Sequence, residues 1–246
     1  MTLRRSQGSD QGRHLMFAEP FRGSLDHMLP LRRLYPLIAA SGMLAGAAML
    51  AAGQLDAPYD RVDLTIGRYA ALEHGGYTAI ALALFGLAVL PLLAGLRAVR
   101  APVSGWPERL MLGWAGALAG AAVLPGTVVA DVLVAAALMC MAGASALMVR
   151  RFGEDARWTA AARPLEWLAL GAGGGLAALI YVSLPGHQDM VGLVQWALFA
   201  VDIAVVQVPL VRLVRMVWLE SVSGARTGLE NTARGTAHAT AVLSRH

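Results

Sequence analysis

Six blocks of apolar residues, each long enough to cross a bilayer, constrain this chain more than any other feature of its sequence. A helix rises 1.5 Å per residue, so about 20 apolar residues cross a hydrocarbon core of roughly 30 Å. The chain has 246 residues, of which 57% are hydrophobic and 15% charged, whereas soluble domains carry about 25% charged residues. The sequence therefore predicts an all-α integral membrane protein, a bundle of about six transmembrane helices. The blocks cover residues 36–54, 74–96, 109–125, 128–149, 165–185 and 190–211.

The basic residues predict which way the bundle faces. Every cationic side chain is Arg, and the chain contains no Lys. Cytoplasmic loops of membrane proteins carry an excess of such residues, and only Arg61 and Arg68 fall in connections on the opposite side. This pattern predicts a multi-pass membrane protein with both termini in the cytoplasm. It argues against nucleic acid as a partner, because that would need clustered basic residues with interleaved aromatics.

The chain outside the blocks is short, so a single bundle forms the whole fold. We expect a cytoplasmic flexible tail over 1–33, the transmembrane bundle over 34–215 and a cytoplasmic C-terminal tail over 216–246. The first outer connection, 55–73, could hold a short surface helix. Residues 31–54 combine basic, apolar and small residues as a signal peptide does, but the apolar run is long, so we expect a retained span.

Residue types exclude several classes of function. Cys140 is the only cysteine, which excludes an intrachain disulfide and a Cys-based metal site. The lack of Lys excludes a retinal Schiff base, and no nucleophile elbow, phosphate-binding loop or dinucleotide fingerprint occurs. No cofactor is predicted. Aromatic residues fall at the predicted span ends, where such rings are enriched: Tyr35, Trp106, Trp158, Trp167 and Trp218 on the cytoplasmic side, and Tyr59, Tyr69 and Tyr77 on the outer side.

Pairs of glycines predict close helix packing. Within lipid there is no hydrophobic drive between helices, so faces with small residues four apart allow backbones to approach. These faces could serve contacts within the bundle, a membrane-protein partner or a homo-oligomer, besides the lipid bilayer itself. The pairs are Gly42/Gly46, Gly116/Gly120 and Gly171/Gly175.

Asp202 is the strongest single candidate for a functional residue, because it lies in the middle of the sixth block. An Asp at the centre of a bilayer costs roughly 2.5–3.5 kcal/mol, and no Arg, Lys or His falls within the core of any block. We expect Asp202 to be uncharged, or to contact water or a bound cation. Gln195 lies on the same helical face about 10 Å towards the outside, and Gln207 lies on a neighbouring face. Two interpretations stay open: a neutral carboxyl that holds the bundle together, and a site for a proton, an ion or a substrate.

A second group of candidates gathers at the predicted outer ends of the spans. His and carboxylate side chains at similar depth could bind zinc or another divalent ion, or act as general acid and base on a lipid or small substrate. The spacing matches no recognised metal signature, and carboxylates near helix N-termini also act as caps. No metal is therefore predicted. The residues are Glu73, His74, Asp131, His187 and Asp189.

Two further carboxylates have a simpler interpretation. Glu108 and Glu166 open the third and fifth spans next to Pro107 and Pro164. We expect them to cap these helices and to pair with Arg109 or Arg163.

Three segments carry a resemblance to a known family: "VLPGTVVADVLVAAALMCMAGASALMVRRF", "WLALGAGGGLAALIYVSL" and "GLVQWALFAVDIAVVQVPLVRLVR". They resemble the six-span prokaryotic membrane proteins of domain-of-unknown-function family 998 over roughly residues 35–215. The resemblance implies the six-span architecture and no established reaction. Where that family tends to have a His in the fourth span and a basic residue in the sixth, this chain has Asp131 and Gln195-Trp196.

Three classes of function follow. The first is a non-catalytic membrane component that packs with a protein partner or lipid, and it needs only the small-residue faces and the tails. The second is a small proton- or cation-coupled transporter that uses Asp202. The third is a membrane-embedded enzyme with an outer-face His and carboxylate site. We rank them in that order, so the chain is not expected to be an enzyme.

Overall fold

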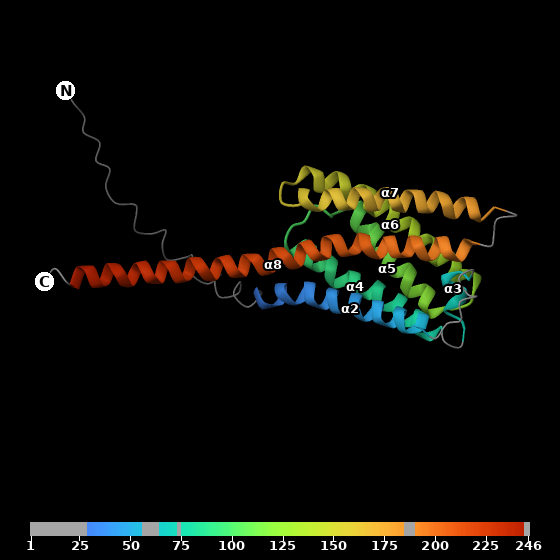
Figure 1. Ribbon diagram of the computed structural model, residues 1–246, viewed down its shortest axis with the longest axis horizontal. Helices are drawn as coiled ribbons and strands as arrows, with labels where there is room; N and C mark the ends of the chain where they lie inside the picture. The colour runs from blue at the N-terminus through green and yellow to red at the C-terminus, as the bar shows by residue number, and fades with distance from the viewer. Residues whose placement is uncertain (1–28, 56–63, 73–74, 185–189, 244–246) are drawn as a thin grey trace, which may run out of the picture.

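The structure is a bundle of α-helices in which each long helix packs against the one before it. It is a computed structural model that describes residues 29–55, 64–72, 75–184 and 190–243. Within these ranges it contains seven helices and no strand. The helices are α2 (Leu29–Leu55), α3 (Ile66–Tyr69), α4 (Gly76–Ala98), α5 (Trp106–Val123), α6 (Val128–Glu154), α7 (Thr159–Val182) and α8 (Val191–Leu243) (Figure 1).

Five of the helices are long and apolar enough to cross a membrane. An all-helical bundle with several membrane-span-like helices is therefore confirmed. α5 corresponds to the predicted block 109–125 but is not among the five, since it has 18 residues and opens with the polar run Pro107-Glu108-Arg109. The five segments are Leu34–Leu55, Gly76–Ala98, Val128–Glu154, Thr159–Val182 and Val191–Trp218.

The long helices run alternately up and down the bundle (Figure 1). α5 packs between α4 and α6 and is antiparallel to both, so α4 and α6 run in the same direction. α8 packs on α7 and closes the bundle against α2, α4 and α6. The turns at 99–105 and 155–158 lie at one end, called the Arg end, whereas α3 and the turn at 124–127 lie at the other, called the α3 end (Figure 1). The backbone of α8 continues as one helix beyond the Arg end.

Glycine and a cap define the turn at the α3 end. Gly126 has a φ of +75°, a left-handed conformation that favours glycine, and its N–H donates to the carbonyl of Gly67 over 3.0 Å. Thr127 then caps α6, because its hydroxyl accepts from the N–H of Ala130 at 3.1 Å. This turn joins α3 to the start of α6, which fixes the first outer connection onto the bundle. A short helix does occur in that connection, namely α3, but it is not a surface helix, because Ile66, Gly67 and Tyr69 are buried.

Small residues set the spacing of the helices. A Cβ added to Gly42 would lie 2.9 Å from Cβ of Ala88, and one added to Gly175 would lie 2.8 Å from Cδ1 of Leu198. The first pair of the predicted glycine faces therefore packs α2 on α4, and the third packs α7 on α8. Gly116 faces open space, so its pair is only partly used.

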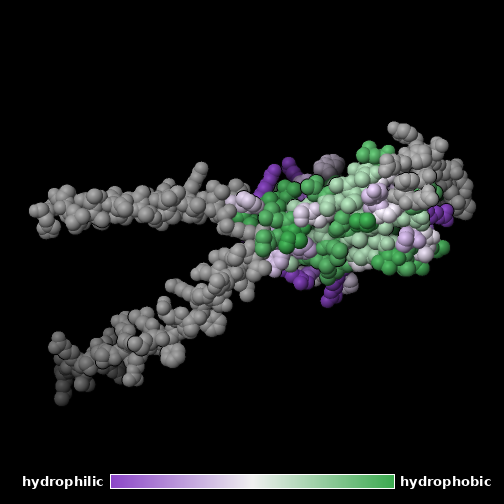
Figure 2. Space-filling model, turned by 90° about the horizontal axis from the view of Figure 1, so that it is seen from below, coloured by the Kyte–Doolittle hydropathy of each residue, from purple (hydrophilic) through white to green (hydrophobic). Residues whose placement is uncertain are grey.

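The outer surface of the described bundle is mostly apolar, with polar groups gathered near the two ends (Figure 2). Trp106, Trp167 and Trp218 are exposed, as expected for aromatics at span ends. Trp158 and Tyr69 also lie at helix ends, but their side chains are buried. Trp158 packs on Phe152 with ring centroids 4.9 Å apart, and the hydroxyl of Tyr69 donates to the carbonyl of Gly53 over 2.7 Å. Tyr59 lies outside the described residues.

Candidate functional site

Asp202 lies inside the bundle with its side chain fully buried. It comes from α8, whose buried face also carries Phe199, Val205 and Val206. Trp114 of α5 is buried as well, and its indole N–H donates to Oδ2 of Asp202 over 3.2 Å. Since α5 packs mainly between α4 and α6, this hydrogen bond reaches across the bundle and ties α5 to α8.

The second carboxyl oxygen of Asp202 is unusual. Among the residues that the structure describes, Oδ1 has no hydrogen-bond partner, and Asp202 belongs to none of the ion pairs. A buried oxygen without a partner is a position where a proton, a water molecule or an ion belongs. The site can therefore hold the bundle together, and it can also accept one of these small species.

The two glutamines on α8 do not meet Asp202. Gln195 is buried, and its amide oxygen accepts from the N–H of Ile66, the first residue of α3, over 3.0 Å. Gln195 thereby anchors the outer connection. Gln207 lines a separate cavity between α7 and α8 near the Arg end. All three residues lie on α8, as predicted, but each has a different environment in the bundle.

Asp131 anchors the same outer connection from α6. Its Oδ1 accepts from the hydroxyl of Thr65 over 2.8 Å, and its Oδ2 lies 3.8 Å from Nε of Arg68. A Cβ on Gly67 would lie only 2.5 Å from Oδ1 of Asp131, so glycine permits this approach. Asp131 and Gln195 thus hold α3 from two different helices.

The remaining outer-face candidates lie outside the described residues. They are Glu73, His74, His187 and Asp189. Within the described ranges, no three His, Cys, Asp or Glu side chains form a group that could hold a metal ion.

One ion pair at the Arg end differs from the prediction. Glu108, nearly buried at the start of α5, pairs with Arg97 at the end of α4 rather than with Arg109. Arg109 instead lies over the ring of Trp106, 5.6 Å from its centroid. Arg97 is closer because α4 and α5 are antiparallel, which places the end of one beside the start of the other. Glu166 is exposed and makes no ion pair with a described residue.

A chain of polar contacts holds the turn between α6 and α7. Asp155 accepts from the backbone N–H of Arg157 over 2.9 Å, and this hydrogen bond is the main cause that lowers the pKa of Asp155 below its usual value. The carbonyl of Arg157 accepts from Nε and Nη2 of Arg212 at 3.3 and 2.7 Å. Arg212 on α8 is thereby fixed beside the start of α7.

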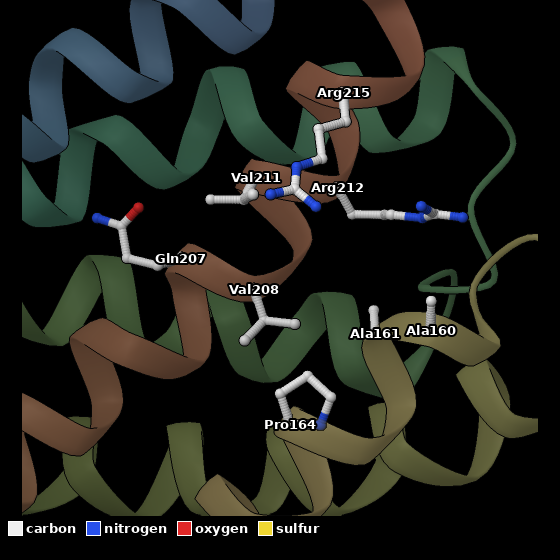
Figure 3. A pocket seen from close by; sticks show the side chains of 8 residues that line it. All are labelled: Ala160, Ala161, Pro164, Gln207, Val208, Val211, Arg212 and Arg215. Atoms are coloured by element: carbon white, nitrogen blue, oxygen red, sulfur yellow. The ribbon is translucent and has the colours of Figure 1, made fainter. Parts of the chain in front are cut away.

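A cavity of about 310 Å³ opens between the start of α7 and this part of α8. Figure 3 shows Pro164 and Val208 on its two walls, with the guanidinium groups of Arg212 and Arg215 above them. Ala160, Ala161, Gln207 and Val211 complete the lining.

The sequence did not indicate Trp114 as part of the site. A signal was present, because Trp114 falls well inside the third block rather than at its end, and a buried indole N–H needs an acceptor. The partner itself could not be found without knowing that α5 and α8 face each other.

Together, the membrane-span-like helices, the apolar surface and the buried polar pair define a multi-pass α-helical membrane protein. No family model, no curated protein and no solved structure matches the chain.

Proposed function

We propose that this protein is a non-catalytic membrane component that associates with another transmembrane helix through the exposed face of α7. The supporting observation is how little of α7 the bundle covers. Only 11% of an 18-residue apolar stretch of α7 is buried inside the bundle, whereas 56% of the corresponding stretch of α4 is buried. α7 lies at the edge of the bundle, against α6 and α8 (Figure 1).

The composition of the exposed face of α7 favours a helix over lipid as its neighbour. Gly173 and Gly174 have no atom within 4 Å of an added Cβ, and Ala177 and Ala178 are exposed one turn further on. Large side chains flank this patch on α7, among them Leu170 and Ile180, whereas the exposed face of α2 carries Leu44 in its middle at 73% exposure, beside exposed alanines. Small residues give lipid little to pack against but let a second helix approach closely.

The other polar side chains support a structural role. Asp131, Glu108 and Gln195 each bind a partner within the bundle, which removes them as free acids, bases or ligands. The resemblance to domain-of-unknown-function family 998 is part of this proposal and adds no reaction to it.

We further propose that all six long helices cross a prokaryotic inner membrane with the Arg end in the cytoplasm. α4 and α6 run in the same direction, so α5 must return the chain from one face to the other. The excess of Arg at one end supports the orientation. With six crossings, both termini lie on the cytoplasmic side.

This topology predicts which turns are accessible from outside the cell. In a Cys140→Ser background, a Pro125→Cys variant should react with a membrane-impermeant maleimide in intact cells, because the 124–127 turn is exposed at the α3 end. Ser104→Cys, equally exposed at the Arg end, should react only after the cells are permeabilised. Labelling of both positions from the same side would contradict the crossing of α5.

The role of α7 predicts a specific cross-link. In the Cys140→Ser background, Ala177→Cys should cross-link in native membranes to a second copy or to a defined membrane protein. Gly174→Ile should reduce that product several-fold, because a branched side chain prevents close approach. Leu44→Cys on α2 and Gly116→Ile on the open face of α5 are the matched controls. No product at Ala177→Cys, or an equal one at Leu44→Cys, would rule out the proposed interface.

A second candidate, a small proton- or cation-coupled transporter, is favoured by one observation. Oδ1 of Asp202 has no partner among the described residues, which leaves a buried position for a proton or cation. The substitution that separates the two functions, Asp202→Asn, is considered in the Discussion.

A further inference from the structure

We propose that the cavity between α7 and α8 at the Arg end binds the headgroup of an anionic phospholipid. The cavity holds about 310 Å³, enough for a phosphate with its glycerol but not for two acyl chains. The inference depends on the bundle lying in a membrane and not on the partner of α7.

The first argument is uncompensated positive charge. Arg212 and Arg215 both line the cavity, and neither forms an ion pair with a carboxylate of the described residues. Arg212 uses Nε and Nη2 on the carbonyl of Arg157, which holds its planar group in place while Nη1 stays available. Arg guanidinium groups bind phosphate oxygens with paired N–H donors. Two such groups lining one cavity supply the charge and the N–H donors that a phosphate group needs.

The second argument is the order of groups along α8. Gln207 lies five residues before Arg212, about 7.5 Å deeper along the helix axis. It makes no hydrogen bond to a described residue, so its amide can donate to a ligand. In a phospholipid the ester carbonyls lie a few ångströms below the phosphate, towards the acyl chains. Arg212 and Arg215 thus lie at the depth of the phosphate, and Gln207 lies at the depth of an ester group.

The third argument is the apolar lining of the cavity, which favours a lipid over a soluble phosphate compound as the ligand. Pro164, Val208 and Val211 form the walls between the arginines and Gln207 (Figure 3). Val211 is 47% exposed, so the cavity continues onto the outer surface, where acyl chains would run. A soluble phosphate compound would leave these walls in contact with water. Basic pockets between transmembrane helices on the cytoplasmic side bind acidic lipid headgroups elsewhere.

The test is retention of lipid by the full-length protein. Nanodiscs of phosphatidylcholine with a minor fraction of phosphatidylglycerol are prepared, and lipid retained on release into the gas phase is measured by native mass spectrometry. We expect selective retention of phosphatidylglycerol and a higher thermal midpoint than in phosphatidylcholine alone, because a ligand that binds only the folded state stabilises it. Arg212→Gln combined with Arg215→Gln should weaken retention about tenfold or more, since loss of a hydrogen bond to a charged group lowers affinity by roughly a factor of ten or more.

The control removes the same charge from the same end. Arg100→Gln combined with Arg150→Gln changes two exposed residues outside the cavity and should leave retention within about twofold of the wild type, because exposed charges away from the headgroup are largely screened by salt. Arg215→Gln alone and Gln207→Leu each test the site without touching the Arg212 contacts, and each should reduce retention. An equal loss in the control pair would show nonspecific surface attraction and overturn the proposal. Displacement of the lipid by inorganic phosphate, with equal protection by phosphate alone, would also overturn it in favour of a soluble ligand.

Discussion

Replacing Trp114 with Phe should destabilise the bundle far more than replacing Asp202 with Asn. The Phe ring fills much of the same space but removes the only donor that the described residues offer to the Asp202 carboxyl. A buried acceptor left without any partner costs about 1–3 kcal/mol, and more where the group is charged. Asn keeps an oxygen at the position of Oδ2, so the indole hydrogen bond survives. Unfolding midpoints of the purified variants in one mild detergent would measure the difference.

A double-mutant cycle can isolate this contact. Asp202→Leu leaves the indole N–H of Trp114 without an acceptor, and Trp114→Phe leaves the carboxyl without a donor. The combined variant has neither unpaired group and should be more stable than the sum of the two single losses predicts, because removing both partners of a buried hydrogen bond costs less than removing one. Strict additivity would show that the contact between α5 and α8 does not contribute to stability.

The same Asn variant separates the two candidate functions. If the protein is a structural component, Asp202→Asn should leave both its stability and its cross-linking through α7 close to those of the wild type. If it is a proton-coupled transporter, the variant should fold normally but lose proton-dependent uptake in reconstituted vesicles. The reason is that the Asn amide, unlike the Asp carboxyl group, does not gain and lose a proton near neutral pH. A stable variant that retains full uptake would remove Asp202 from any transport mechanism.

Features that depend on residues close together in the sequence could be predicted, whereas contacts between distant segments could not. Apolar length predicted six blocks, and each corresponds to one long helix of the bundle. The Pro-Gly turn before α6 was recognisable from residues 125–126. These are local features. α5, predicted from the block 109–125, is not among the five span-like helices because its first turn is polar, and its packing between α4 and α6 places it in the bundle.

Contacts between distant segments could not be predicted, because a single sequence does not say which helices are neighbours. Asp202 was identified as costly and in need of a partner, but Trp114 lies 88 residues away along the chain. The same limit explains why Glu108 was assigned to Arg109 instead of Arg97. It also explains why Gln195 was interpreted together with Asp202, whereas its amide holds α3.

Replacing Gly86 with Ala is expected to have the second large effect. Gly86 lies on the buried face of α4, where an added Cβ would come 2.6 Å from the backbone carbonyl oxygen of Ala115 in α5. A helix backbone cannot move aside as the end of a side chain can, so α4 and α5 must separate. Overpacking of this kind costs about 1–3 kcal/mol, and the shift would reach Trp114, the residue next to Ala115. We expect a clear fall in the unfolding midpoint and loss of the coupling between Trp114 and Asp202.

Gly116→Ala is the matched control, because the same single methyl group is added one residue after Ala115 but faces open space. Ala favours a helix over Gly by about 1 kcal/mol, so this variant should be as stable as the wild type or slightly more so. The pair therefore tests the position of α5, the one long helix that is not among the five span-like helices. Equal midpoints for the two variants would mean that α5 does not face α4 at Gly86. The Trp114 indole would then have no reason to point at Asp202, and the buried pair would have to be abandoned together with the helix arrangement that produces it.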